Sequence, residues 1–283
     1  MLRIAIQSKG RLHDDTISLL READIKIRES KRTLLVQASN FPVEALFLRD
    51  DDIPETVATG VADVGIVGLN ELEEKGADCE IVRHLGFGAC RLSLAVPKEE
   101  AYSGPQWFNG KTIATSYPAI LRRYLKQQRL TATIHVISGS VEISTGVGLA
   151  DAIFDIVSSG STLVNNNLRE VETVMQSDAV LVARKNLEPE KRAVLNEMLF
   201  RFDAIKNAET KKYVLLNAPA EKVDEITALL PGVKSPTVMP LAESGWCSIH
   251  TVIDEDRFWE LIGKLKAAGA QGILVMDIEK LIA

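Results

Sequence analysis

The feature that most constrains the fold is the alternation, through most of the chain, of short apolar runs with longer amphipathic segments. Short apolar runs suit strands that are buried on both faces of a sheet, and the segments between them are long enough to form helices. This alternation predicts an α/β fold with largely parallel sheets. The expected strands are Arg3–Gln7, Thr33–Gln37, Ala62–Val67, Leu92–Val96, Thr112–Ala114, Ile134–Ile137, Ala152–Val157 and Ala179–Ala183.

Two helix starts are marked by capping residues. Asp52 and Glu55 have the spacing of a capping box, with Pro54 in the first turn. Ser116, followed by Pro118, has the pattern of an N-cap before a second helix. Both helices are therefore expected to begin at these polar residues.

The order of the elements predicts two α/β lobes. The chain is expected to leave the first lobe near Ser93–Pro97 and to return to it near Glu170–Ser177. Residues 1–90 and 178–208 would then form the first lobe, and residues 91–177 the second. A double crossover leaves a cleft between two lobes, and small ligands usually bind in such clefts. The substrate site is expected there.

The last part of the chain, residues 209–283, has a different order of elements. A helix at Glu190–Ala208 is expected to lead into it, and Pro231-Gly232 and Gly269 are expected to end its helices. The order β-α-β-β-α-β predicts a ferredoxin-like (ACT-like) domain. Its expected elements are strand Tyr213–Asn217, helix Ala220–Leu230, strands Thr237–Leu241 and Cys247–Val252, helix Glu255–Ala268 and strand Gly272–Met276.

Composition excludes several classes of protein. The 283 residues are 46% hydrophobic and 25% charged, which is ordinary for a folded chain with more than one core. The net charge of −6 argues against a general nucleic-acid-binding or membrane-binding surface. Because no apolar run has transmembrane length and the start reads as a strand rather than a signal peptide, we expect a cytoplasmic protein.

The cysteines and histidines indicate neither a disulfide framework nor a zinc site. Cys79, Cys90 and Cys247 are few and far apart, and none belongs to a CxxC pair, so we expect reduced side chains. The four histidines show no metal-ligand spacing among themselves or with the cysteines.

The segment richest in chemistry follows the expected strand Ala152–Val157. A loop of small hydroxyl residues and glycine leads there into a helix, and it consists of Ser158, Ser159, Gly160, Ser161 and Thr162. Free N–H groups at a helix start, together with hydroxyl groups, suit a phosphomonoester. Asp155 and Asp151 would be repelled by a phosphate unless they accept hydrogen bonds from ribose hydroxyls or hold magnesium through water. A plain turn with an N-capping Ser or Thr fits the same residues.

A longer pattern around this loop resembles the signature of ATP phosphoribosyltransferases. The matching positions are Glu142, Gly148, Ala150, Ile153, Asp155, Ile156, Ser159, Gly160, Thr162 and Leu163. The resemblance to the long form of the family extends to Lys9–Leu12, Arg49–Pro54, Arg91–Leu94, Ile113–Pro118, Ser235–Thr237 and Gly272–Val275. One departure is Leu69-Asn70, where many relatives carry an acidic residue.

The resemblance implies a fold and an activity. The fold would consist of two lobes similar to type II periplasmic binding proteins, followed by a C-terminal domain through which histidine inhibits the enzyme. The enzyme would be a glycosyltransferase (pentosyltransferase) that transfers phosphoribosyl from phosphoribosyl pyrophosphate to adenine N1 of ATP, at the entry to histidine biosynthesis. Magnesium would be required, held mainly by substrate and water, with its direct protein ligands unknown. The expected assembly is a homo-hexamer, with a dimer as the alternative.

The resemblance also assigns residues to ligands. The loop Ser158–Thr162 would bind the 5′-phosphate, and Asp155 and Asp151 would face the ribose. Lys9 and Arg11 would bind the pyrophosphate; two isolated charges would ordinarily indicate a solvated basic turn, and the family position reverses that preference. The remaining assignments are Glu142 for orienting ATP or holding a magnesium-bound water, and Arg49, Asp50 and Tyr117 for ATP, although a partly buried aromatic at a helix start fits Tyr117 equally. Near the ends of expected strands, candidates for a pocket that binds inhibitory histidine are Asn217, Ser235, Thr237 and His250, although turn residues and a satisfied histidine fit them about as well.

Three other functions fit parts of the pattern. A two-lobed protein can bind or sense a small molecule without catalysis, because a fold does not determine a function. A phosphoribosyltransferase with another acceptor base, or an amino-acid sensor built around the C-terminal domain, would share some of the same features. Release of pyrophosphate that requires both ATP and magnesium separates these possibilities.

Overall fold

The computed structural model describes residues 1–28, 33–230 and 235–282. Two compact units make up the chain, Met1–Val194 and Leu195–Ala283. Helix α6 (Pro189–Glu209) contains the boundary between them. Pro231-Gly232, which was expected to end a helix, lies outside the described residues.

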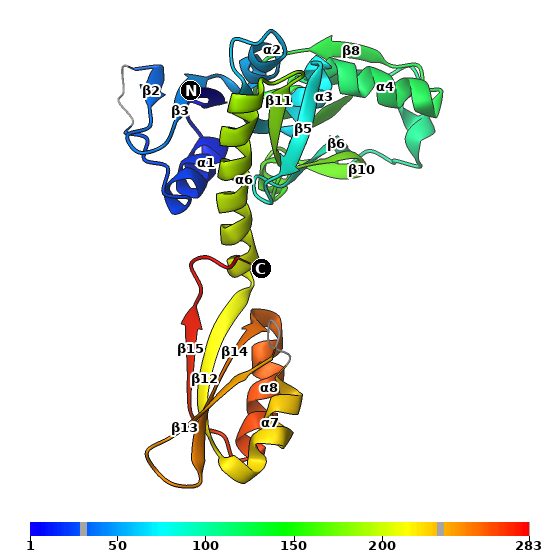
Figure 1. Cartoon of the computed structure of the whole chain (residues 1–283). Coiled ribbons are helices and arrows are strands. Elements are labelled where there is room, and N and C mark those ends of the chain that lie inside the picture. The colour runs from blue at the N-terminus through cyan, green and yellow to red at the C-terminus, as the bar shows by residue number, and fades with distance from the viewer. Residues whose placement is uncertain (29–32, 231–234, 283) are drawn as a thin grey trace. The chain divides into compact units, whose positions relative to one another are not determined.

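The first unit contains two sheets, and the first sheet has the order β2-β3-β1-β4-β11-β5. Its strands are β1 (Leu2–Gln7), β2 (Leu35–Gln37), β3 (Val43–Leu48), β4 (Val64–Gly68), β5 (Cys79–His84) and β11 (Ala179–Arg184). β1 is parallel to β3 and β4, whereas β2 and β11 run antiparallel to their neighbours. The helices of this lobe are α1 (Arg11–Glu22), α2 (Ile53–Ala58) and α3 (Leu69–Lys75) (Figure 1). The strands β3 and β5 were not predicted: β5 contains the charged residues Glu80 and Arg83, whereas β3 contains one, Glu44, in an otherwise apolar run.

The second sheet of this unit has the order β10-β6-β9-β7-β8. Its strands are β6 (Cys90–Pro97), β7 (Thr112–Thr115), β8 (Thr133–Val136), β9 (Ala152–Val157) and β10 (Leu168–Ser177), with helices α4 (Pro118–Gln128) and α5 (Ser161–Asn165) and 3-10 turns at Pro105–Phe108 and Val141–Ile143. β7 runs parallel to β8 and β9, but β6 is antiparallel to both β9 and β10. This sheet is therefore mixed rather than largely parallel.

The two crossings between the sheets lie slightly outside the predicted segments. The chain leaves the first sheet after His84 and enters β6 at Cys90, so that Ser93–Pro97 already belongs to the second sheet. It returns between Ser177 and Ala179, and Glu170–Ser177 is itself strand β10. Each crossing is only a few residues long, which places the ends of both sheets close together.

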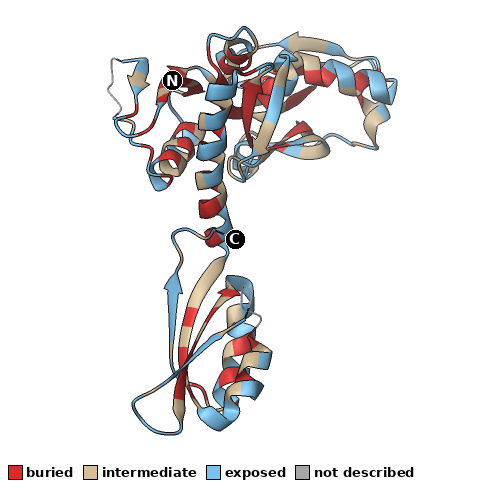
Figure 2. Cartoon of the chain, in the orientation of Figure 1, coloured by how far each residue is buried: buried red, intermediate tan, exposed pale blue. Residues whose placement is uncertain are grey.

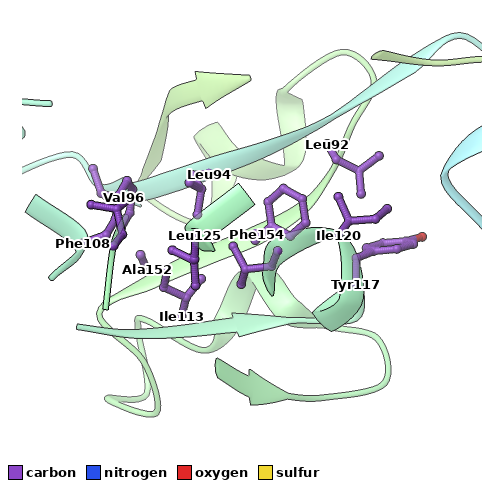
Figure 3. Close-up of a cluster of buried hydrophobic side chains, with 12 residues drawn as sticks. Leu92, Leu94, Val96, Phe108, Ile113, Tyr117, Ile120, Leu125, Ala152 and Phe154 are labelled. Carbon is purple, nitrogen blue, oxygen red and sulfur yellow. The ribbon is translucent and has the colours of Figure 1, made fainter. Parts of the chain in front are cut away.

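The second lobe is held by a compact apolar cluster (Figure 3). Phe154 of β9, Leu92 and Leu94 of β6, and Phe108 have no exposed surface. Tyr117 lies at the edge of the cluster, with its oxygen directed away from the other side chains. The buried strands thus fix β9, and with it the start of the hydroxyl-rich loop.

The helix starts were placed well, but their caps were predicted wrongly. Asp52 has helical backbone angles in a 3-10 turn before α2, and its side chain caps nothing. α4 begins at Pro118 as expected, yet the Ser116 hydroxyl donates to the carbonyl of Ile137 at 2.8 Å. The carboxylate of Glu74, on α3, accepts from the first N–H groups of α4 instead, so an acidic side chain from the other lobe provides the cap.

The second unit confirms the ferredoxin-like prediction. Its strands form an antiparallel sheet in the order β13-β14-β12-β15, with helices on one face (Figure 1). The elements are β12 (Lys211–Pro219), α7 (Val223–Leu229), β13 (Thr237–Pro240), β14 (Trp246–Asp254), α8 (Glu255–Ala267) and β15 (Gln271–Asp277). Val214, Leu216 and Ile249 have no exposed surface, and Leu261 and Leu265 of α8 belong to the same buried core. Buried positions are seen along β12 and on α8 in Figure 2. Along β12 and β14 buried residues alternate with more exposed ones, as expected for a sheet covered on one side.

Candidate active site

A hollow of about 270 Å³ opens where the ends of the two sheets of the first unit meet. The first lobe contributes Gln7 at the end of β1 and Asn70 and Glu71 after β4. The second lobe contributes Ile156 and Ser158 at the end of β9. Ligands of α/β sheets bind beyond the carboxyl ends of strands, which is where these residues lie.

The hydroxyl-rich loop forms one side of this hollow. Gly160 has φ +80°, a left-handed conformation that favours glycine, and it immediately precedes α5. The Ser161 N–H points to the Ser159 hydroxyl oxygen at 3.4 Å, and the two hydroxyl oxygens are 2.9 Å apart. Ser158, Ser159, Ser161 and Thr162 are all exposed. The first N–H groups of a helix have no partner within it, so this turn can donate several hydrogen bonds to an anion.

Two of the expected carboxylates are brought together beside the loop. Asp155 is half-buried on β9, and burial raises its pKa to about 6 despite a hydrogen bond from the N–H of Ile156. The negative charge of Glu142, in the turn Val141–Ile143, raises this pKa further. The chain between Glu142 and Asp155 therefore folds back so that both carboxylates share one environment.

Asp151 lies at the other end of β9. Its carboxylate accepts a hydrogen bond from the N–H of Thr112 at 2.8 Å and pairs with Lys111 at 3.5 Å. The six residues of β9 lie between Asp151 and Ser158, so seven residue steps separate them, which corresponds to about 23 Å at ~3.3 Å per residue. The fold does not bring Asp151 to the loop that Asp155 borders.

The basic residues after β1 differ in position. Arg11 begins α1 and lines the hollow, with its side chain 76% exposed and its Nε 3.9 Å from Asp15. Lys9 is exposed in the preceding turn and is not among the residues that line the hollow. Arg11 is therefore an exposed cation at the rim of the hollow, where an anionic ligand can reach it.

The residues expected to contact ATP are also separated. Asp50 lines the hollow, and its carboxylate accepts from the N–H of Asp51 at 3.1 Å. Arg49 is directed to Asp51, with Nε 3.2 Å from the carboxylate, and its side chain is 79% exposed. Tyr117 is buried behind the wall of the hollow. Asp50 alone of these three lines the hollow in the part of the chain that the structure describes.

A buried polar network crosses between the lobes at Tyr117. Its hydroxyl donates to Glu71 at 2.9 Å, and the Asn70 side-chain amide donates to the same Glu71 oxygen at 3.0 Å. The Ser177 hydroxyl donates to Asn70 at 2.9 Å and accepts from its N–H at 3.0 Å. Burial raises the pKa of Glu71, and burial together with the Glu71 charge raises that of Tyr117. Asn70, which departs from the family pattern, is thus part of the contact between lobes.

Comparison with known proteins decides the family. The family model for ATP phosphoribosyltransferase matches residues 49–204, and the model for the C-terminal domain of the same family (HisG, C-terminal domain) matches residues 208–280. An ATP phosphoribosyltransferase of Bacteroides thetaiotaomicron is 67% identical over 282 residues, covering 100% of both chains. The chain belongs to the ATP phosphoribosyltransferase family.

Solved structures agree with this membership. The ATP phosphoribosyltransferase (HisG:HisZ) complex from Thermotoga maritima matches with a TM-score of 0.63 and 28% identity, covering 71% of this chain and 96% of that one. A histidine kinase sensor domain with similarity to periplasmic binding proteins matches with a TM-score of 0.50 over 73% of this chain and 90% of that one. At 10% identity this second likeness shows the fold alone. The expected two-lobed fold is confirmed.

Two structural features of this family member were missed by sequence reasoning. Glu71 carried no signal beyond its place after β4, since a lone Glu on a helix is ordinarily solvated. Arg91 belongs to a segment that resembles the family, but no role followed from it. Its guanidinium binds both oxygens of Glu170 through Nε and Nη2 and donates from Nη1 to the Ser158 carbonyl at 3.2 Å. This pairing lowers the pKa of Glu170 to about 2 and ties the start of the loop to β6 and β10.

Among the described residues, no three or more His, Cys, Asp or Glu side chains are arranged to hold a metal ion. The Glu142 and Asp155 carboxylates nevertheless offer hard oxygen donors beside the loop, which suits Mg²⁺ bound largely by water and substrate phosphate. No helix in the described ranges is long and apolar enough to cross a membrane.

In the second unit of this chain, three of the four residues expected at a histidine site share one face of the antiparallel sheet. Thr237 of β13 lies directly opposite His250 of β14, and Asn217 of β12 lies opposite Ser248. Because residues two apart in a strand point the same way, all of these side chains project from the same face. The His250 ring lies between Tyr213 at 2.6 Å and Ser248 at 3.0 Å. Ser235 lies two residues before the start of β13.

Proposed function

We propose that this chain transfers the phosphoribosyl group of phosphoribosyl pyrophosphate to N1 of ATP, releasing pyrophosphate, as the first step of histidine biosynthesis. The observation that carries this is the hydroxyl-rich turn after β9 at the edge of an inter-lobe hollow, in a chain that matches its relatives over its whole length. We place the reaction in the cytoplasm, where a biosynthetic step finds its ATP.

Phosphoribosyl pyrophosphate is bound by the second lobe. The turn Ser158–Thr162 holds the 5′-phosphate through N–H groups at the start of α5 and through its hydroxyls. Asp155, two residues before Val157 at the end of β9, accepts hydrogen bonds from the ribose hydroxyls. We leave Asp151 out of this site, because it lies at the far end of the strand.

The pyrophosphate is received by cations from the first lobe. Arg11, at the rim of the hollow, and Lys9 supply positive charge toward the leaving group. Magnesium would neutralise further charge on the pyrophosphate, with Glu142 as the side chain that holds one of its waters. As the bond from ribose C1′ to the pyrophosphate oxygen breaks, both electrons leave with pyrophosphate, and these groups stabilise that charge.

Adenine N1 needs no base to become a nucleophile. Its lone pair is free and it carries no proton, so the new bond to C1′ forms with inversion and without a proton transfer. The task of the protein is therefore to hold both substrates in line, which is worth several orders of magnitude in rate. Asp50 and Arg49 are the first-lobe candidates for contacts to ATP. Tyr117 acts on the ATP side through Glu71 rather than through an exposed ring.

The second unit is the regulatory part of this proposal. Inhibitory histidine binds at the face that carries Asn217, Thr237 and His250, with Ser235 at its edge. Histidine alters catalysis by favouring a less active arrangement of a homo-hexamer, which is in exchange with dimers.

An ultraviolet assay tests the proposal. Purified protein with ATP, phosphoribosyl pyrophosphate and magnesium should give an absorbance change, because substitution at N1 alters the adenine chromophore. The signal should need all three components, release one pyrophosphate per turnover and fall when histidine is added. A folded protein that gives no signal but binds another small molecule tightly contradicts the proposal and favours a sensing role.

A further inference from the structure

We propose that Glu71 recognises the adenine of ATP, by accepting a hydrogen bond from its 6-amino group in the hollow between the lobes. This inference deepens the proposed function and rests on it. It assigns a specificity-determining role to a residue that lies outside every motif carrying the family resemblance.

The first step of the argument is the position of Glu71. It lines the hollow, yet only 8% of the residue is exposed, so its carboxylate is set into the wall rather than displayed on the surface. The opposite wall carries Ile156 and Ser158, at the end of the strand that bears Asp155. A planar base between these walls has Glu71 on one side and the proposed phosphoribosyl site on the other.

The second step is how Glu71 is held. One carboxylate oxygen, Oε1, accepts from the Tyr117 hydroxyl at 2.9 Å and from the Asn70 amide at 3.0 Å. Tyr117 belongs to the other lobe, and Asn70 is held in turn by Ser177. The second oxygen, Oε2, accepts no hydrogen bond from the described residues. It is not one of the fully enclosed side-chain atoms that lack a partner among these residues, so part of its surface is accessible. It is left to receive a donor from a bound molecule.

The third step is the chemistry of that donor. N1 and the 6-amino group are neighbours on one edge of adenine, so whatever binds the amino group also aims N1. When N1 bonds to ribose C1′, positive charge develops and spreads onto the 6-amino nitrogen. A carboxylate at this position therefore binds the transition state more strongly than the substrate, which is the condition for catalysis.

The electrostatics of the hollow favour such a partner. Burial raises the pKa of Glu71, and the charges of Asp50 and Asp51 raise it further, with Lys75 acting in the opposite direction. A carboxylate whose charge is poorly compensated gains most from a developing cation. Asp50 also lines the hollow, but it lies in a 3-10 turn and is not anchored from both lobes.

The test compares ATP with purine riboside triphosphate, which keeps N1 but lacks the 6-amino group. Pyrophosphate release gives kcat/KM for both nucleotides at saturating phosphoribosyl pyrophosphate. In Glu71→Gln the amide oxygen continues to accept the hydrogen bonds from Tyr117 and Asn70. The amide nitrogen then faces the 6-amino group of adenine, and because both groups are donors they cannot form a hydrogen bond. We expect the preference for ATP over the analogue to fall about 10- to 100-fold, the range of a hydrogen bond to a charged group.

Glu74→Gln is the matched control. Glu74 is on the same helix and also binds α4 across the lobes, but it does not line the hollow. It should lower kcat/KM for the two nucleotides by the same factor. Should Glu71→Gln fail to fold, Tyr117→Phe removes only one of the two hydrogen bonds to Oε1 and is expected to lose part of the preference for ATP.

The outcomes are distinguishable. Equal losses for both nucleotides in Glu71→Gln or, if that variant does not fold, in Tyr117→Phe, would show a structural role only and overturn the inference while the proposed function stands. A wild-type protein that releases no pyrophosphate from ATP and phosphoribosyl pyrophosphate overturns the proposed function, and this inference with it. A reduced preference in Glu71→Gln beside an unchanged preference in Glu74→Gln supports the assignment.

Discussion

Replacing Asp155 with Asn is expected to stabilise the catalytic unit and to impair its reaction at the same time. Burial and the nearby Glu142 raise the pKa of the carboxyl group from 3.8 to about 6. The folded protein therefore holds this proton more tightly than the unfolded chain does. The contribution of Asp155 to stability is fully present below about pH 4 and is lost as the pH rises through about 6.

The magnitude follows from the size of the rise. About two pKa units, at ~1.36 kcal/mol each, make the charged carboxylate cost ~3 kcal/mol of folding free energy at neutral pH. Asn has nearly the same shape and can keep the hydrogen bond from the Ile156 N–H, but it does not ionise. For a unit of this size we expect Tm to rise by roughly 5–10 °C at about pH 8 and by little at about pH 4.

Thermal unfolding at these two pH values measures the effect. Asp151→Asn is the matched control on the same strand, because its carboxylate is exposed and bound to Thr112 and Lys111, so it should give no gain. In the ultraviolet assay Asp155→Asn should lower kcat/KM for phosphoribosyl pyrophosphate about 10- to 100-fold. A lower Tm for Asp155→Asn than for the wild type at about pH 8, or the same change in Tm at both pH values, would refute the electrostatic argument. Unchanged kinetics would remove Asp155 from the ribose site.

Three further substitutions test the proposed roles of the loop and of the regulatory domain. Gly160→Ala places an L side chain at φ +80°, which costs ~1–2 kcal/mol although the space around it is open. Thermal unfolding should therefore show a Tm lower by a few degrees. Kinetics should show a several-fold higher KM for phosphoribosyl pyrophosphate, with the KM for ATP unchanged. In Arg91→Lys the lysine cannot form both the two-point contact with Glu170 and the hydrogen bond to the Ser158 carbonyl. Steady-state kinetics should therefore show a several-fold rise in the KM for phosphoribosyl pyrophosphate. An unchanged KM would show that the loop keeps its shape without Arg91. His250→Ala should weaken histidine inhibition about tenfold, measured as the inhibition constant, while kcat without histidine stays the same; equal inhibition would place the histidine site elsewhere.

Several parts of the fold and site could be predicted because their signals are local. The strand β9, the glycine in its loop and the following helix start are contiguous in sequence, so hydrophobic pattern and turn chemistry together predicted the turn that we propose binds the phosphate. The ferredoxin-like unit was equally readable, because each of its strands and helices is bounded by turn residues. Strand β5 lies at the edge of its sheet and was missed because charged residues such as Glu80 and Arg83 weaken its apolar pattern. Strand β3 lies inside the sheet, between β2 and β1, and was missed although Glu44 is its only charged residue.

The features that could not be predicted from the sequence depend on contacts between distant segments of the chain. Asn70 and Ser177 are 107 residues apart in the chain, and Arg91 and Glu170 are 79 apart, yet each pair is in direct contact. No local pattern predicts such a pair, since the sheet register and the two short crossings determine which strand ends meet.

The sequence by itself determined the α/β class, the ferredoxin-like end and the chemistry of the loop, because hydrophobic periodicity and turn residues act over a few positions. Only the tertiary structure decided which carboxylates lie close together. It placed Asp151 just before β9, four residues and roughly 13 Å from Asp155, and brought Glu142 beside Asp155. It also set Glu71 into the wall of the hollow, where burial and the charges packed around it give an ordinary glutamate its unusual environment.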